Sequence, residues 1–94
     1  MSFMQFETVY SSQSRTEKGK WEYFVGEPII LNSNYIIEVK KVDKSPRFSS
    51  EAAEKLSKIF DLPTSELSLF QISIYNKDDE FIVMPDKKFK DFIK

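Results

Sequence analysis

The sequence predicts an α+β fold: a mostly antiparallel five-stranded sheet in the order strand-strand-strand-helix-strand-strand-helix, with one helix packed on a face and a short C-terminal helix. Several short segments alternate between apolar and polar residues, which is typical of strands. One segment near the middle of the chain instead carries apolar residues at helical spacing. An OB-like small barrel is the alternative, because that fold also places a helix between its third and fourth strands.

The first half of the chain predicts three strands. Residues 3 to 10 alternate, and the polar residues 11 to 20, which lack any period, predict an exposed loop. Residues 21 to 31 form a second strand that bends or bulges near Gly26. The next three residues, Asn-Ser-Asn, readily turn, so we expect a hairpin into a third strand at residues 35 to 42.

The second half predicts two helices around two strands. A helix over residues 49 to 61 has Ser49 or Ser50 as its N-cap. Its apolar stripe, at helical spacing, consists of Ala52, Ala53, Leu56, Ile59 and Phe60. Residues 67 to 84 form a second hairpin that turns at residues 76 to 80. Pro85, at a first helical position, begins a terminal helix whose apolar face consists of Phe89, Phe92 and Ile93.

Length and charge place limits on what the chain can do. Ninety-four residues suit a single domain, residues 1–94, with no linker or internal repeat. The net charge is −1, so the molecule as a whole attracts neither polyanions nor polycations, and any charged partner must be recognised by a local cluster. The N-terminal segment lacks the pattern of a secretory signal, and no apolar run is long enough to span a membrane. We therefore expect a cytoplasmic protein with no membrane partner.

Cysteine and histidine are both absent. Disulfides, thiolate nucleophiles, histidine general bases, Ser-His-Asp triads and Cys/His zinc sites are therefore excluded. Only carboxylates, lysines, tyrosines and hydroxyl groups remain for catalysis. We expect no cofactor, no metal and no catalytic residue, and hence not an enzyme.

One short motif nevertheless suggests catalysis. Glu38 and Lys40 alternate onto one face of a predicted strand, and Glu27 precedes them by eleven residues. This E-x-K pattern resembles the metal-dependent nucleases of the PD-(D/E)xK superfamily, in which an acidic residue precedes a hairpin and E-x-K follows on the next strand. The resemblance covers about fifteen residues and implies that Glu38 holds Mg²⁺ while Lys40 orients water. Gly26 stands where that family has proline, and a charged, solvent-facing strand is the commoner explanation of the motif.

A nucleic-acid surface is a second possibility. Four cations gather at the end of the third strand: Lys40, Lys41, Lys44 and Arg47. Proteins that bind single strands combine such cations with aromatic rings on which bases stack. The candidate rings are Tyr23, Phe24, Tyr35 and Tyr75. The acidic residues 78 to 80, in the turn between the last two strands, would repel phosphate and oppose this interpretation.

A protein-binding surface is the third possibility and the one that the sequence favours. Phe3, Phe24, Ile36 and Phe81 lie on strand faces opposite the expected core residues. Either the sheet is covered on both sides, by the helices or by curling, or some of these residues contact a partner or a second copy. The partner-binding candidates are Phe24, Ile36, Tyr75, Lys40, Lys41, Lys44 and Arg47.

We therefore expect a small non-enzymatic binding module, a regulator, adaptor or inhibitor that acts by protein contact as a monomer or homodimer. Small proteins of this kind are frequent in bacteria, phages and mobile elements. Binding of nucleic acid and the nuclease-like E-x-K site remain the alternatives.

Overall fold

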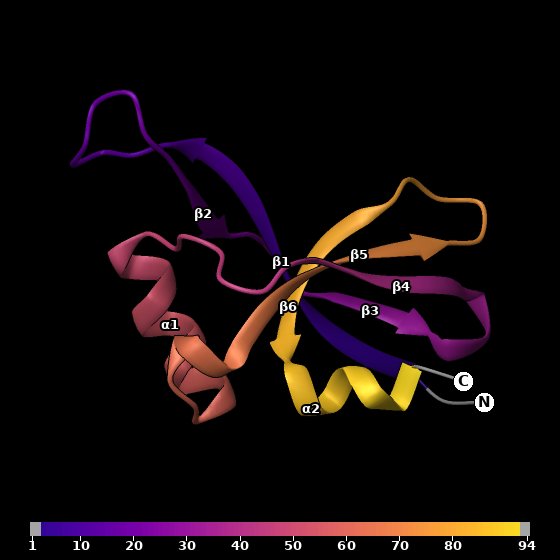
Figure 1. The fold of residues 1–94 in the computed structure, drawn as a ribbon. Coiled ribbons are helices and arrows are strands. Elements are labelled where there is room, and N and C mark those ends of the chain that lie inside the picture. The colour runs from indigo at the N-terminus through magenta and orange to yellow at the C-terminus, as the bar shows by residue number, and fades with distance from the viewer. Residues whose placement is uncertain (1–2, 93–94) are drawn as a thin grey trace.

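The structure, a computed structural model, describes residues 3–92 and is a small α+β domain with a mostly antiparallel six-stranded sheet (Figure 1). The strands are β1 (Phe3–Gln13), β2 (Trp21–Val25), β3 (Ile29–Asn32), β4 (Ile36–Asp43), β5 (Leu67–Ile74) and β6 (Glu80–Pro85). The α-helices are α1 (Ser50–Phe60) and α2 (Asp86–Phe89). Three short 3-10 turns are η1 (Ser33–Tyr35), η2 (Thr64–Glu66) and η3 (Lys90–Phe92).

The sheet has six strands instead of five because the predicted second strand is broken at Gly26. Its two halves, β2 and β3, both pair with the long strand β1. The backbone N–H of Gly26 donates to the carbonyl oxygen of Thr8 at 2.9 Å, and the Thr8 hydroxyl donates to the carbonyl oxygen of Glu27 at 2.6 Å. A Cβ at position 26 would lie 2.8 Å from the Thr8 hydroxyl oxygen, so the break requires glycine.

The predicted hairpin between the second and third strands is wrong. The Asn32 side chain accepts a hydrogen bond from the backbone N–H of Asn34 at 2.9 Å and caps η1, and β4 then pairs with β5 instead of β3. The sheet order is β2-β1-β6-β5-β4, with β3 also on β1. The path ends at β2 and β4, which do not pair with each other, so the described strands do not close into the small barrel of the alternative prediction. Pairing with β5 places Val39 against Ile72 and so adds β4 to a core.

Strands β5 and β6 are buried on both faces. Alternate residues contribute to two clusters, because successive side chains of a strand point to opposite faces. The first core contains Phe6, Leu31, Phe70, Ile72, Ile74, Ile82 and Met84. The second core lies under α1 and contains Val9, Leu56, Leu67, Leu69 and Val83. The sequence predicted either a sheet covered on both faces or apolar residues exposed to a partner. In β5 and β6 the sheet is covered on both faces.

The two helices cover different cores. The Ser49 hydroxyl accepts a hydrogen bond from the backbone N–H of Ala52 at 3.1 Å, as predicted for an N-cap, and α1 ends at Asp61 in the left-handed conformation. Pro85 is the last residue of β6 and precedes α2, so its predicted place inside the helix is wrong. Phe89, whose ring centroid is 4.7 Å from that of Phe70, packs α2 against the first core. Ile93, the third residue of the predicted apolar face, lies outside the described residues.

A hairpin arm extends from the sheet. Strand β1 continues to Gln13 and pairs with β2, so the predicted loop shortens to residues 14–20. We call residues 11–23 the arm; in Figure 1 it extends to the upper left, away from the remaining strands. Within the part of the chain that the structure describes, no helix has both the length and the apolar character needed to cross a bilayer.

Candidate functional site

The basic segment at the end of β4 does not form one open cationic surface. The Lys41 ammonium lies 2.9 Å from an Asp86 carboxylate oxygen and 5.9 Å from the centroid of the Phe89 ring. The Arg47 guanidinium lies 2.7 Å from Glu17 and 3.5 Å from a carboxylate oxygen of Glu22. Two of the four predicted cations therefore hold elements of this chain together.

Lys40 and Lys44 are the other two predicted cations. Both are exposed, and neither forms an ion pair with any residue between positions 3 and 92. Lys40 is in register with Gln71 of β5, so it lies on a sheet face, whereas Lys44 lies beyond the end of β4. Two separate lysines attract a polyanion only weakly.

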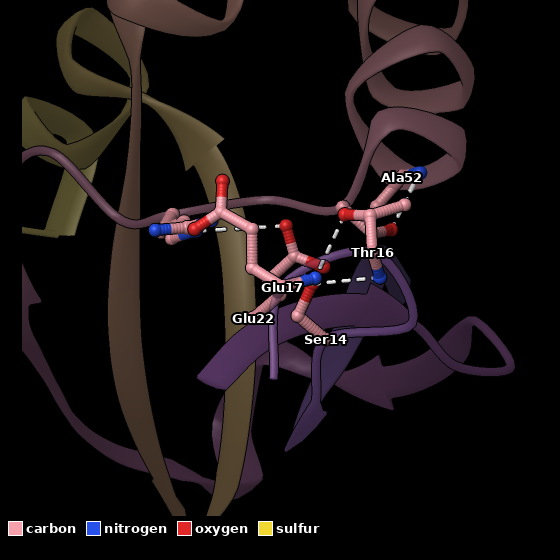
Figure 2. A network of polar contacts seen from close by, with 7 residues as sticks. Ser14, Thr16, Glu17, Glu22 and Ala52 are labelled. Carbon is pink, nitrogen blue, oxygen red and sulfur yellow. Dashed lines mark hydrogen bonds and ion pairs between the residues drawn. The ribbon is translucent and has the colours of Figure 1, made fainter. Parts of the chain in front are cut away.

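The ion pairs of Arg47 with Glu17 and Glu22 tie the arm to the segment before α1. Figure 2 shows both glutamates and, beside them, the polar residues of the arm tip. The Ser14 hydroxyl accepts hydrogen bonds from the backbone N–H groups of Thr16 and Glu17 at 3.2 and 3.0 Å, which shapes the tip of the arm. The hydrogen bond from Arg47 lowers the pKa of Glu17 below its usual value of 4.5. Backbone bonds from Tyr23 to Arg47 and from Ser49 to Tyr23, at 2.8 and 3.0 Å, extend this link. Arg47 therefore connects the arm to the segment before α1 by both its side chain and its backbone.

The four predicted stacking rings have different environments. Phe24 is buried, with only 9% of its surface exposed, so its predicted exposed position on a strand face is wrong. The Tyr10 ring stacks on the Phe24 ring with 5.7 Å between the ring centroids, and the Arg15 guanidinium lies 5.5 Å from the centroid of the Phe24 ring. Tyr23 is half-buried against the second core. Only Tyr35 and Tyr75 are exposed, at 54% and 61%.

The E-x-K residues lie on β4 without further metal ligands. Glu38 is in register with Ser73 and Lys40 with Gln71, so the two side chains share a face, as predicted. Glu27 precedes β3, which does not pair with β4. Between residues 3 and 92, no three acidic side chains cluster closely enough to hold a metal ion. The residues present do not fit the magnesium site that the nuclease resemblance implies.

A groove runs beside β4 and contains one of the predicted partner-binding residues, Ile36. Ile36 and Val39 of β4 lie on one side, and Met4 of β1 and Phe92 of η3 lie on the other. All four are half-buried and border the first core. We call this the seam groove; its volume is about 340 Å³, and its further lining residues are Ser33, Ile37, Glu38 and Asp91.

Three large exposed side chains lie at or next to the start of β4. Tyr35 and Tyr75 lie with their ring centroids 6.4 Å apart, and the backbone N–H of Tyr75 donates to the Tyr35 carbonyl oxygen at 2.8 Å. Ile37 lines the groove and is 67% exposed. The seam groove and these three residues together are called the seam surface.

The exposure of Ile37 corrects the predicted faces of β4. Strict alternation placed Tyr35, Ile37 and Val39 on one face and Ile36 on the other. The register with β5 shifts between Ile36 and Glu38, so Ile37 is an extra, bulged residue, and Ile36 and Val39 both face the first core. No local sequence signal marks this bulge, because it depends on the strand with which β4 pairs.

The outer edge of β4 has no strand partner among residues 3–92. Its backbone N–H and C=O groups on that side are therefore available to another chain. Register shifts at both ends leave Glu38–Lys41 as the regular part of this edge.

Comparison with known proteins gives no match: no family model fits the sequence, and no curated protein or solved structure is detectably similar to it.

Proposed function

We propose that this chain is a small non-enzymatic protein-binding module, a regulator, adaptor or inhibitor, and that it binds its partner through the seam surface. The observation that carries the proposal is the free backbone edge of β4 beside the seam groove, together with the exposed side chains Tyr35, Ile37 and Tyr75. An extended segment can add to such an edge by main-chain hydrogen bonds, while the adjoining groove accepts its side chains.

The design of β4 favours a specific partner over indiscriminate pairing. Bulges twist a strand edge away from a flat template, and lysines on an edge oppose stacking of identical strands. In β4 the bulges flank Glu38–Lys41, and Lys40 and Lys41 lie inside that stretch. Such an edge accepts a short strand whose acidic side chains complement the two lysines. Apolar contact with Ile37 and Tyr75 would supply additional affinity.

Nucleic-acid binding has less support. Lys41 and Arg47 are engaged in ion pairs, and of the predicted rings only Tyr35 and Tyr75 are exposed. An Asp79 carboxylate oxygen accepts a hydrogen bond from the Gln71 side chain at 2.9 Å, which brings negative charge close to the sheet face that carries Lys40.

The proposal is tested by capturing proteins from the source cell with the tagged chain and with Ile37→Asp and Tyr75→Asp. Trp21→Asp is the matched control, because Trp21 is 60% exposed but lies on the arm. We expect a specific protein to be retained by the wild type and by Trp21→Asp, and to be lost with both variants of the seam surface. Circular dichroism checks that each variant is folded. Retention that is independent of Ile37 and Tyr75, or no specific retention at all, would refute the assignment.

A further inference from the structure

Glu7 is a buried acidic residue whose carboxylate has no partner among residues 3–92. It lies in the middle of β1 and is 9% exposed. Its carboxylate makes no ion pair or side-chain hydrogen bond with any residue that the structure describes. No fully enclosed side-chain oxygen in residues 3–92 lacks a hydrogen-bond partner, so the Glu7 carboxylate oxygens must still reach solvent. They do so in a groove.

This groove lies on the opposite face of β1 from the seam groove, because Met4 and Glu7 alternate onto different faces. Ile59 and Phe60, from the last turn of α1, form one wall. Val83 and Met84 of β6 contribute to its lining, and Lys88 of α2 stands at its edge. We call it the carboxylate groove, and its volume is about 160 Å³.

Exposed apolar side chains continue the carboxylate groove across the sheet. Gln5 lines the groove and is directly paired with Ile30 of β3, and Phe3 shares the same face of β1. Phe3 and Ile30 are each 66% exposed, and Ile59 is 43% exposed. An apolar strip from two strands and a helix thus surrounds one carboxylate.

The charge of Glu7 determines what can cover this strip. A partner that buried the carboxylate without pairing it would lose the hydration of a full charge, which is strongly unfavourable. A second copy that docked by the same face would bring a second Glu7 toward the first, which adds repulsion. Lys88 lines the groove, but its ammonium lies beyond the 4.0 Å of an ion pair. No cation among residues 3–92 pairs with Glu7, so a partner protein that covers this groove has to supply one.

We propose that the carboxylate groove binds a segment of a partner protein in which large apolar side chains surround one arginine or lysine, whose cationic head pairs with Glu7. Arginine fits best, because its planar guanidinium can donate two parallel hydrogen bonds to a carboxylate. The proposal rests on a protein-binding function but uses a surface separate from the seam surface.

The first test selects phage-displayed random dodecapeptides on the purified chain and measures the affinity of the enriched peptides by fluorescence polarisation. We expect the enriched peptides to carry a cation flanked by apolar residues. Glu7→Gln, which keeps the shape and removes the charge, and Ile30→Asp should each weaken binding about tenfold or more, an effect that corresponds to one charged hydrogen bond. Tyr75→Asp, on the seam surface, is the control and should leave the affinity unchanged.

Two outcomes of the selection overturn the proposal: enriched peptides without a cation, or binding that Glu7→Gln leaves intact. The seam surface is tested separately. If the peptides lose affinity only for Glu7→Gln and Ile30→Asp, the carboxylate groove is supported, even when the protein captured from the cell does not depend on Ile37. If capture of the partner protein depends on Ile37 but no selected peptide depends on Glu7, the proposed function stands and the inference about the carboxylate groove is refuted.

Thermal unfolding distinguishes a binding role of Glu7 from a structural one. The Glu7 carboxylate oxygens reach solvent and make no ion pair or side-chain hydrogen bond within the described chain, so their charge contributes little to the stability of the free protein. Glu7→Gln should therefore leave the Tm within about a few degrees of the wild-type value. Lys88→Ala should leave the Tm unchanged. A lower Tm in both variants would show that Glu7 pairs with Lys88 within the chain, and would refute the proposal.

Discussion

The β5–β6 hairpin and the β1–β2 arm are both antiparallel strand pairs, but they are stabilised in different ways. In β5, Phe70 and Leu69 are buried on opposite faces, one in each core. In the arm, most residues beyond Tyr10 are exposed, and the tip is ordered by Ser14 and by the ion pairs of Arg47 (Figure 2). The β5–β6 hairpin at the centre of the molecule is thus stabilised by burial of apolar side chains, and the arm at its periphery by hydrogen bonds and ion pairs.

This comparison also locates the binding surfaces. Where the sheet is covered on both faces, the buried side chains of the two cores expose less than a tenth of their surface. The exposed apolar residues lie where this coverage ends: Ile37 at the free edge of β4, and Phe3 and Ile30 beyond the last turn of α1. Incomplete coverage by two short helices is thus the physical origin of both proposed surfaces.

The largest expected effect is at the centre of the hairpin. Phe70→Ala removes a fully buried ring that contacts Phe89, and should lower the free energy of unfolding by about 3–5 kcal/mol. Phe81→Ala, on the paired strand but 44% exposed, is the matched control and should change it by less than about 1 kcal/mol. Urea unfolding measures both. Similar losses in the two variants would mean that the hairpin is not held by burial.

A smaller effect is expected where the arm meets α1. Ser49→Ala removes the N-cap hydroxyl that accepts from the backbone N–H of Ala52, and should cost about 1 kcal/mol of stability. Ser50→Ala is the control, since Ser50 is the first residue of α1 and is exposed. Chemical unfolding followed by circular dichroism reports the difference. Equal stabilities for the two variants would contradict the capping role of Ser49.

The sequence was sufficient for local features of both regions. Alternation predicted the β5–β6 hairpin, and the hydroxyl before an apolar stripe predicted Ser49 and α1. These predictions succeed because the relevant contacts lie within a few residues of one another along the chain. The expectation of α+β class follows from the same local patterns and is confirmed.

The sequence was insufficient where distant strands decide the outcome. Pairing of β4 with β5 instead of β3 creates the bulge at Ile37 and the free edge, and no local pattern encodes it. Phe24 alternates like an exposed residue, but Arg15 and Tyr10 cover it. Glu7 alternates like a solvent-facing residue, but α1 and β6 enclose it. Both proposed surfaces thus depend on long-range pairing.

A pH-dependent effect is expected where the hairpin meets α2. Asp86 accepts a hydrogen bond from the buried Ser68 hydroxyl at 2.6 Å and lies 2.9 Å from Lys41. These contacts, the hydroxyl first, lower the pKa of Asp86 below its usual value of 3.8. The unfolded chain then binds the proton more tightly, so the stabilisation is complete above about pH 4 and is lost as the pH falls through the lower folded-state pKa.

Asp86→Asn tests this linkage. Because the Asp86 side chain is 36% exposed, solvent screens its interactions, and the variant should lose less than about 1 kcal/mol at neutral pH. Urea unfolding between neutral pH and about pH 3 should show the wild type and the variant converging as the pH falls below the usual aspartate pKa. A constant difference across this range would show that the charge of Asp86 does not contribute.

The smallest effect on global stability is expected in the arm. Arg47→Gln removes the ion pairs with Glu17 and Glu22. Arg47 and Glu17 are exposed, so solvent and salt screen the shorter pair, and the Glu22 contact is long at 3.5 Å; the unfolding midpoint should therefore hardly change. The arm itself should loosen: amide hydrogen exchange of residues 14–20 should accelerate, whereas exchange in β5 stays slow. High salt should reproduce this pattern in the wild type. If exchange accelerated in β5 as well, the arm and the hairpin would unfold as one unit, and their separate modes of stabilisation would have to be abandoned.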